Sequence, residues 1–369
     1  MHGKTTTQLA LYGAFCLAIL LAPLVVDNAF LLNKYARYLV LAIVAISLSL
    51  SWGYAGILNL GQAATFGIGS YCMAMALKLK TIPVHTGPDG LPDFMVWNNV
   101  TELPWIWQPF HSLPFAVFAG IALPSLFAGL IGWFIFGGRI TGVYAAIITL
   151  AVMVVLNLVI VDQQAYTGGF NGITDLAQFE VGEVAFDAYS ASTYYLVAIC
   201  LALTLFLALV ITKSKVGLVL QAIRDQEERV RFFGYDVARY KTFVFMVSAG
   251  IAGIAGMLYT IVMEFASPTF LSVPLSLSIV IWVAVGGRQS LLGAAIGALI
   301  VTGIQGALSE SEAFLDTWTL IMGGLFVIVV LVMPKGLAGA GEILARRIFS
   351  SQRSSSDRAE VGSAVERLS

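Results

Sequence analysis

Apolar segments of about twenty residues recur along the whole chain. Of its 369 residues, 59% are hydrophobic and 11% are charged, whereas soluble domains carry about 25% charged residues. A bilayer core needs about 20 apolar residues per helix, and backbone groups in lipid must bond within their own segment. The sequence therefore predicts an all-α polytopic membrane protein with about ten transmembrane helices. The predicted spans are residues 8–26, 36–52, 62–79, 113–136, 142–161, 193–212, 242–263, 270–286, 291–308 and 317–333.

Glycine interrupts two apolar regions, at residues 53–69 and 286–306, which predicts broken or re-entrant segments there. The first apolar run, Gln8 to Val26, is longer than a secretory signal core and lacks a small-residue cleavage site, so we expect it to remain as the first span. We expect the transmembrane permease domain to occupy residues 1–349. Residues 350–369 are rich in serine and charge, which predicts a disordered cytoplasmic tail.

Basic residues decide the predicted orientation, because cytoplasmic loops carry an excess of Lys and Arg. With the N-terminus inside, 16 of the 20 basic residues fall in inside segments and 13 of the 21 acids fall outside. We therefore predict an N-in, C-in topology with an even number of spans. In this topology residues 80–112 and 162–192 are periplasmic loops, and residues 213–241 form a cytoplasmic loop.

The two predicted periplasmic loops have compositions that suit folded structure. Residues 80–112 hold five prolines and three tryptophans, which predicts either a small lid beside the periplasmic mouth or part of an aromatic belt. Residues 162–192 contain Gly168, Gly169 and Gly172, which favour tight turns and close backbone approach. The three tryptophans are Trp97, Trp105 and Trp107.

The predicted cytoplasmic loop contains a charged amphipathic helix from Val216 to Phe233, with an apolar stripe that Gln226 interrupts. Glu227 and Arg231 form an i,i+4 pair in the favourable order, and Gly234 is a natural helix stop. Such a helix, joined to spans on both sides, either transmits force from a cytoplasmic partner or is a connector on the membrane surface. The stripe consists of Val219, Ile223, Val230 and Phe233.

Two side-chain amides lie at the first glycine-broken region. Asn59 and Gln62 are three residues apart, on neighbouring positions of a predicted helix, and Thr65 follows one turn later. Polar amides at membrane depth rarely face lipid. Two interpretations stay open: hydrogen bonding between helices, or the lining of a pathway by a broken helix. An uncharged amide lining would suit a small, polar, uncharged solute.

No catalytic or metal-binding pattern accompanies these segments. Cys16, Cys72 and Cys200 lie in apolar runs without metal-ligand spacing, and the three histidines lie outside those runs. The sequence has no phosphate-binding loop, so the energy for active transport must come from another subunit. Its net charge of -1 gives no basic field for nucleic acid. We expect a chain that is not an enzyme and needs no cofactor.

Six motifs follow one another between residues 40 and 340: Asn59–Tyr71, Thr167–Gly172, Gly217–Glu227, Lys241–Tyr259, Gly286–Arg288 and Pro334–Leu337. Together they resemble the branched-chain amino acid permease family of ABC importers. Within that family the chain is most similar to the larger permease type of urea transporters. The segments that carry this finer likeness are Leu91–Asn98, Thr101–Trp105, Val230–Asp236 and Trp282–Arg288.

The resemblance implies a permease subunit of the inner membrane that forms a heterodimer with a second permease. It also implies two cytoplasmic ATP-binding subunits and a periplasmic solute-binding protein as partners. Asn59, Gln62 and Thr65 are the candidate pathway residues, and Gln226 departs from the family, which often has Asp or another small residue there. The residues expected to couple the chain to an ATPase are Gly217, Ala222, Ile223, Arg224, Asp225, Glu227 and Gly234.

Urea is the solute that the resemblance favours. Import of branched-chain or other small amino acids by the same mechanism is the alternative within this class. A passive small-solute channel is a different class and would need no coupling helix. An intramembrane enzyme would need paired acids, a Ser/His set or metal ligands within the spans, and the sequence offers none of these.

Overall fold

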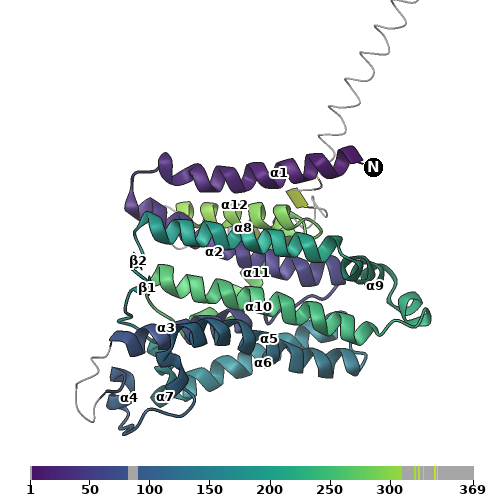
Figure 1. Ribbon diagram of the computed structural model, residues 1–369. Helices are drawn as coiled ribbons and strands as arrows, with labels where there is room; N and C mark the ends of the chain where they lie inside the picture. Colours follow the sequence, from purple (N-terminus) through teal and green to yellow (C-terminus); the bar gives the residue numbers. More distant parts are fainter. Residues whose placement is uncertain are drawn as a thin grey trace, which may run out of the picture.

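The computed structural model describes residues 2–81, 90–309 and seven single residues between 320 and 339, and it is mostly helical. Its long helices run side by side, and Figure 1 separates the two ends of the bundle. The N-terminus and α9 (Lys215–Phe232) lie at one end, which we call the α9 end. The opposite end, the hairpin end, carries β1 (Phe179–Val181), β2 (Val184–Phe186), α4 (Asp93–Trp97) and α7 (Gln164–Thr167).

Nine of the predicted spans coincide with helices, and the remaining one, 317–333, lies largely outside the described residues. Apolar runs of this length form helices because only a helix satisfies its own backbone hydrogen bonds. The long helices are α1 (His2–Leu21), α2 (Ala29–Leu48), α3 (Gln62–Thr81), α5 (Leu113–Gly137), α6 (Val143–Asp162), α8 (Ala191–Lys213), α10 (Val237–Met263), α11 (Val273–Gly286) and α12 (Leu291–Ser309).

Six helical segments among the described residues are long and apolar enough to cross a membrane: α2 with its extension to Tyr54, α5, α6, α8, α10 and α12. The segment Ala10–Leu24 and helix α11 are apolar but shorter. Helix α3 has enough length but carries Lys78 and Lys80 in its last turn and is buried along most of its sequence. The predicted count of about ten spans therefore stays a prediction.

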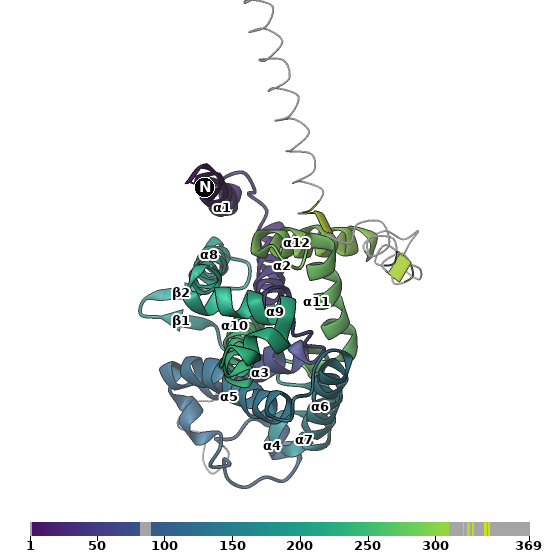
Figure 2. The same cartoon turned by 90° about the vertical axis from the view of Figure 1, so that its right-hand side faces the viewer.

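Helices α3 and α10 form the centre of the bundle and touch backbone to backbone. A Cβ atom on Gly256 would lie 1.9 Å from the carbonyl oxygen of Phe66, and one on Gly69 would lie 2.1 Å from that of Gly253. Glycine at these positions lets the helices approach closely, as is common between membrane helices. Figure 2, which views the bundle from the α9 end, shows the other helices arranged around this pair.

Both glycine-rich interruptions are present. The first lies between α2 and α3, where α2 ends in a π-helical turn (Ser49–Tyr54) and Gly56 has a φ of +73°. The second is a short turn between α11 and α12, in which Gly287 has a φ of +107°. In Figure 2, α11 is seen lengthwise while α8 and α10 are seen end-on, so α11 is steeply tilted against its neighbours.

A buried lysine joins both loops of the hairpin end to α3. The Nζ atom of Lys78 lies 3.0 Å from the carboxylate of Asp93 and donates a 2.9 Å hydrogen bond to the carbonyl of Thr174. The second loop also pairs with the end of α10 through Ile173 and Ala266. Because Gly172 has a φ of +73° and its Cβ would meet the Ala266 carbonyl, the predicted turn and close approach of this loop are confirmed.

Of the three tryptophans, Trp107 alone packs within its loop, and the exposure of the other two leaves the aromatic-belt interpretation open. Trp97 and Trp105 are 74% and 79% exposed, whereas Trp107 donates a hydrogen bond from its indole nitrogen to the Tyr166 carbonyl at 3.0 Å. The apolar centre of the lid is made instead by smaller neighbours that point inward from α4 and from the turn Gln108–His111. These neighbours are Phe94, Met95 and Phe110.

Candidate coupling and pathway site

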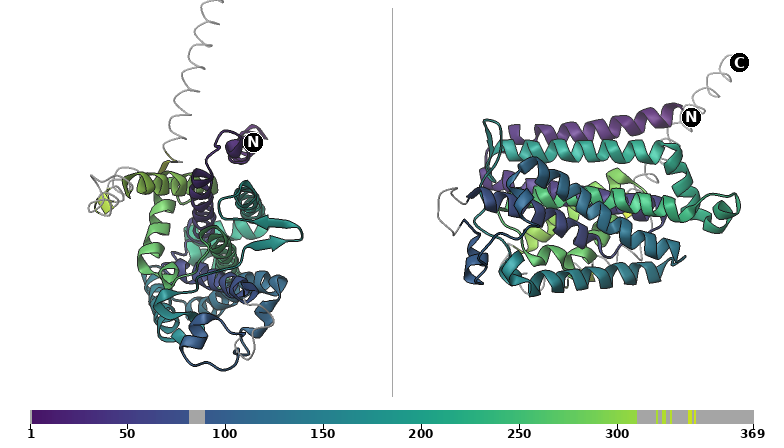
Figure 3. Two further views of the ribbon diagram at one scale, coloured as in Figure 1. Left: turned by 90° about the vertical axis from the view of Figure 1, so that its left-hand side faces the viewer. Right: turned by 60° about the horizontal axis from the view of Figure 1, so that its bottom comes forward.

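The corner between α8 and α9 depends on Gly217. The side chain of Ser214 caps α9 and accepts a 3.3 Å hydrogen bond from the Gly217 nitrogen. A Cβ atom on Gly217 would lie 2.3 Å from the carbonyl oxygen of Thr212, so any larger residue would push α9 away from α8. The right-hand view of Figure 3 shows α9 turning away from the direction of α8 at this corner.

Helix α9 bends at Gln226, whose φ of -153° and ψ of 81° are not helical. The sequence predicted one amphipathic helix here, and the bend falls where Gln226 interrupts its apolar stripe. Ile223 and Val230 of the stripe are buried, but Phe233 follows the last residue of the helix and is 76% exposed. Gly234, with a φ of +87°, follows the last turn and confirms the predicted stop.

Arg224 connects α9 to the broken end of α2. Its Nη1 atom donates a 2.7 Å hydrogen bond to the carbonyl oxygen of Gly53, and its Nε atom lies 2.9 Å from Asp225. A Cβ on Gly56 would lie 3.2 Å from the Arg224 Cγ, so the chain passes close to this side chain. The charged helix is therefore bonded directly to the interruption between α2 and α3.

The turn between α11 and α12 reaches the same place. Its Arg288 carbonyl accepts a 3.0 Å hydrogen bond from the Ser49 hydroxyl, and the Arg288 guanidinium lies 5.8 Å from the centre of the Trp52 ring. Gly53 is the point of closest approach, since a Cβ there would fall 1.8 Å from the Arg288 carbonyl oxygen. Three segments far apart in the sequence thus meet at Gly53.

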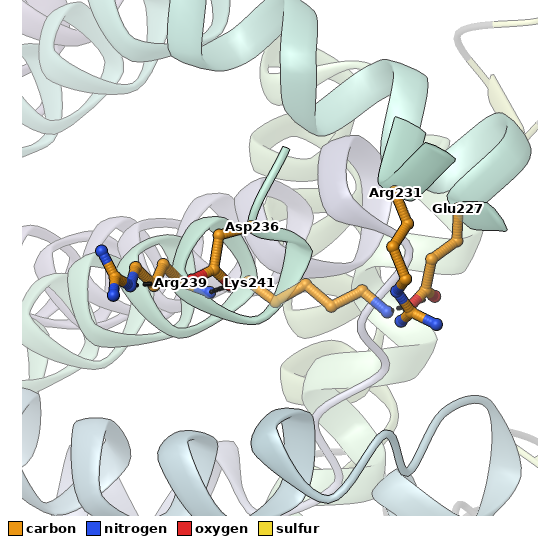
Figure 4. A network of polar contacts seen from close by, with 5 residues as sticks. All are labelled: Glu227, Arg231, Asp236, Arg239 and Lys241. Atoms are coloured by element: carbon orange, nitrogen blue, oxygen red, sulfur yellow. Dashed lines mark hydrogen bonds and ion pairs between the residues drawn. The ribbon is translucent and has the colours of Figure 1, made fainter. Parts of the chain in front are cut away.

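The second half of α9 is held by Glu227, as Figure 4 shows. Its two carboxylate oxygens lie 2.9 Å from Arg231 Nη2 and 2.5 Å from Lys241 Nζ. The Lys241 side chain is 8% exposed and its ammonium also faces the ring of Phe136. Removing one partner of a buried ion pair leaves a charge without compensation, so this contact fixes α9 against the start of α10.

An apolar groove of about 430 Å³ lies along α9. Ala222 and Asp225 are in its wall, and the apolar side chains of Leu218 and Phe233, which also line it, are 63% and 76% exposed. Contiguous exposed apolar surface of this kind is typical of an interaction site. The groove and the bond from Arg224 to Gly53 lie on the same helix.

The two candidate amides form one buried network. Asn59 Nδ2 donates a 2.6 Å hydrogen bond to Gln62 Oε1, and Gln62 Nε2 donates to the hydroxyls of Ser47 at 2.8 Å and Ser248 at 3.3 Å. The prediction that both amides lie on one helix is wrong, because α3 begins only at Gln62. The chain leaves the helix at Gly56 because of its positive φ, and Asn59 then caps the backbone nitrogen of Gly61 at 2.9 Å.

Thr65 lies beside this network but bonds only to its own helix, through the Gln62 carbonyl at 2.8 Å. Thr65, Asn59 and Thr149 border a void of about 10 Å³, which is about the space of one water molecule. Among the described residues, the space next to the candidate pathway side chains is therefore too small for a solute in this conformation. The hydrogen bonds favour the helix-joining interpretation without excluding a pathway wall.

The sequence analysis did not identify the hydrogen-bond partners of Gln62 and of the backbone next to it. Ser47 and Ser248 hold Gln62, while the backbone of Leu60 donates to the Thr149 hydroxyl at 3.2 Å and accepts from Ser276. All four hydroxyl residues lie in apolar helices, where small polar residues favour contacts between helices. A hydroxyl residue inside an apolar span indicates a contact between helices, so these positions could have been found from the sequence. The sequence alone does not say which helices meet.

The fold and this site define a multi-pass membrane protein of the permease class, and no cluster of metal-ligating side chains occurs among the residues that the structure describes. Residues 30–330 match the family model for the permease component of the branched-chain amino acid transport system, and the chain belongs to this family.

Similar proteins carry related descriptions. The high-affinity branched-chain amino acid transport system permease protein LivM of Escherichia coli is 25% identical over 320 residues, covering 80% of this chain and 67% of LivM. The corresponding protein LivH of Escherichia coli is 24% identical over 314 residues, covering 82% and 92%. The ribose import permease protein RbsC of Haemophilus influenzae is 24% identical over 230 residues, covering 60% and 68%. No solved structure matches the chain.

Replacing Arg224 by Met is expected to separate ATP hydrolysis from transport. The change removes the hydrogen bond to Gly53 and leaves a backbone carbonyl without its charged donor, so solute moved per ATP should fall about tenfold or more. Gly217→Val should act in the same direction by moving α9. The measurement is uptake and ATP hydrolysis in the same vesicles. Arg239→Gln is the control, since the Arg239 side chain is 80% exposed and pairs with Asp236. If both variants move the same amount of solute per ATP, Arg224 has no special role in coupling.

Gln62→Leu is expected to reduce uptake strongly while the complex still assembles. The variant leaves the Asn59 Nδ2 group without its acceptor, at a cost of about 1–3 kcal/mol for this buried group, and removes the donor to the Ser47 hydroxyl, which keeps its bond to the Val44 carbonyl. Uptake, complex yield and thermal unfolding in detergent are compared with those of Thr65→Val. Normal transport by an assembled Gln62→Leu complex would make the residue a bystander, and loss of assembly would leave only the helix-joining role.

Proposed function

We propose that the chain is one permease subunit of an ABC importer in the inner membrane, with about ten spans and both termini inside. It pairs with a second permease, two cytoplasmic ATP-binding subunits and a periplasmic solute-binding protein. The observation that carries this proposal is the hydrogen bond from Arg224 to the Gly53 carbonyl. This bond joins the charged helix α9, at one end of the bundle, to the broken span inside the bundle. A subunit driven by an ATPase requires such a connection, whereas a passive channel does not.

In this proposal the ATPase binds the groove of α9. Ala222 and Asp225 contact it from the groove wall, and Arg224 carries the displacement of α9 to Gly53. The remaining coupling residues set the geometry of the helix. Gly217 permits the corner with α8, Ile223 is buried beneath α9, Glu227 ties it to α10 and Gly234 ends it.

The displacement would reach the candidate pathway through the break between α2 and α3. Gly53 is nine residues before Gln62, where α3 starts, so a shift of the π-helical turn must alter the segment that holds Asn59 and Gln62. We propose that Asn59, Gln62 and Thr65 form part of the pathway wall when the void beside them opens. The uncharged chemistry of this wall supports a small polar solute.

We propose urea as the solute. Support comes from the likeness of the outer segment Leu91–Trp105 to urea permeases and from the uncharged amide wall. The alternative, a branched-chain or other small amino acid, is supported by the description of the family and by the names of the LivM and LivH relatives.

We also propose that the solute-binding protein docks at the hairpin end. The loop of residues 90–112 at this end carries the acidic residues Asp93 and Glu102.

The proposed topology predicts opposite labelling of two engineered cysteines in a background without Cys16, Cys72 and Cys200. Glu183→Cys in the turn between β1 and β2 should react with a membrane-impermeant maleimide added to intact cells. Glu228→Cys on α9 should react only after the membrane is permeabilised. Both positions are exposed at opposite ends of the bundle, so the reverse pattern would invert the proposed orientation.

A strain lacking this gene is expected to lose high-affinity, ATP-dependent urea uptake and to keep leucine uptake. Uptake of both labelled solutes is measured at low external concentration, and complementation with the Arg224→Met variant is the control for coupling. Loss of leucine uptake with urea uptake retained would reject urea and leave the permease assignment standing. Uptake that persists when ATP is depleted would support the passive-channel class instead.

A further inference from the structure

Helix α9 holds two different parts of the bundle, one with each of its halves. Before the bend at Gln226, Arg224 donates to the Gly53 carbonyl at the broken end of α2. After the bend, Glu227 is paired with Lys241 at the start of α10, as Figure 4 shows, with 2.5 Å between Oε2 and Nζ. Since the two contacts stand on opposite sides of the bend, a change in its angle moves the end of α2 relative to the start of α10.

The same two helices are joined again, deeper in the bundle, at Ser47 and Ser248. The Ser248 hydroxyl donates a 2.6 Å hydrogen bond to the Ser47 carbonyl, and the Gln62 amide donates to both serine hydroxyls. Ser248 follows Lys241 by seven residues, which is about two helical turns, so both side chains lie on the same face of α10. Ser47 precedes Gly53 by six residues. These contacts therefore connect α9, α2 and α10 in one closed loop.

The contact between α9 and α10 is made by an enclosed charge. The Lys241 side chain is 8% exposed, and its ammonium lies 5.8 Å from the centre of the Phe136 ring on α5. Separating a buried ion pair leaves a charge without compensation, which costs far more than separating an exposed pair. When Glu227 moves with α9, the start of α10 must therefore follow it.

The groove of α9 crosses the bend. Leu218 and Ala222 line it from the first half of the helix, Val230 and Phe233 line it from beyond the bend, and Gln226 is itself part of the wall. An apolar side chain that enters this groove contacts both halves at once. Such an occupant sets the angle between the two halves, and with it the spacing of α2 and α10.

We propose that Lys241 is a second coupling residue, and that the ATPase acts on the bundle by changing the bend of α9 at Gln226. Arg224 then moves the end of α2, Lys241 moves the start of α10, and their relative movement acts on the Gln62 bridge between the two helices. The proposal rests on the permease function proposed above. It adds to the route through Arg224 a second contact, without which α10 does not respond to the ATPase.

The test uses the assembled transporter with its solute-binding protein in proteoliposomes and compares Lys241→Met with Arg231→Met. Uptake of labelled urea and of labelled leucine is measured together with ATP hydrolysis in the same vesicles. Lys241→Met should lower the solute moved per ATP about fivefold or more, because α10 no longer follows α9, while ATP hydrolysis continues. A purely structural role would lower uptake and ATP hydrolysis together and reject the proposal.

Arg231→Met is the matched control. Arg231 pairs with the same carboxylate of Glu227 but belongs to α9 itself, so its loss leaves the contact with α10 in place. The solute moved per ATP should change less than about twofold, the size expected for a partly exposed i,i+4 pair. An equal loss in both variants would show that Glu227 needs only a neutralising charge, and would overturn the role of Lys241.

Two further variants keep the test decisive if Lys241→Met does not assemble. Lys241→Arg keeps the charge and the N–H donors, so it should retain most of the coupling. Glu227→Gln keeps the size of the side chain and removes the ion pair with Lys241, so it should uncouple as Lys241→Met does. Normal coupling in Glu227→Gln would reject the proposal and leave the permease function intact.

The double variant Arg224→Met with Lys241→Met tests whether the two contacts act as one device. Residues that act through one shared element do not have additive effects. Because both contacts act on the same Gln62 bridge, the double variant should move about as much solute per ATP as the weaker of the two single variants. Losses that multiply would place Lys241 outside the route of Arg224 and reject the proposal.

Spin labels at the two ends of α9 report the bend itself. Lys215→Cys and Phe232→Cys, in a background without the native cysteines, place the labels at exposed positions outside the groove lining. Binding of ATP with vanadate should shift the distance between the labels, measured by electron paramagnetic resonance. An unchanged distance would show that α9 moves as a rigid helix and reject the hinge. Absence of ATP-driven uptake by the unmodified transporter would reject the permease function, and this proposal with it.

Discussion

The break between α2 and α3 exposes backbone groups inside an apolar bundle, and the surrounding structure is arranged to satisfy them. An unpaired peptide group in such surroundings costs several kcal/mol. The Gly53 carbonyl is satisfied by Arg224, the Gly61 nitrogen by Asn59 and the Leu60 nitrogen by Thr149. Because one of these donors belongs to α9, a helix outside the bundle is tied to the least regular segment within it.

Helix α3 links this break to the hairpin end. Its first residue, Gln62, belongs to the buried amide network, and Lys78 near its other end holds Asp93 and the Thr174 carbonyl. The glycines that bring α3 and α10 into backbone contact leave little space for the helix to bend independently. Packed contacts therefore run without interruption from the break beside α9 to the loops at the opposite end.

Much of the fold followed from composition and periodicity. Seven of the predicted spans agree with helices to within about five residues, while the first two are displaced further and the last lies largely outside the described residues. A run of apolar residues in lipid has one way to satisfy its backbone. The glycine interruptions and the pair of Glu227 with Arg231 were also predictable, since both depend on near neighbours in the sequence. The exposure of Trp97 and Trp105 and the non-helical backbone angles of Gln226 were not, because hydrophobic periodicity does not specify them.

The sequence by itself determined that this chain is a multi-pass helical protein with a charged helix between two apolar spans, and that its amides at Asn59 and Gln62 require partners. Only the tertiary structure decided who those partners are: Ser248 lies 186 residues from Gln62, and Gly53 lies 171 residues from Arg224. The physical reason is that apolar helices carry little information about their neighbours, so small residues and hydrogen bonds between helices select the arrangement.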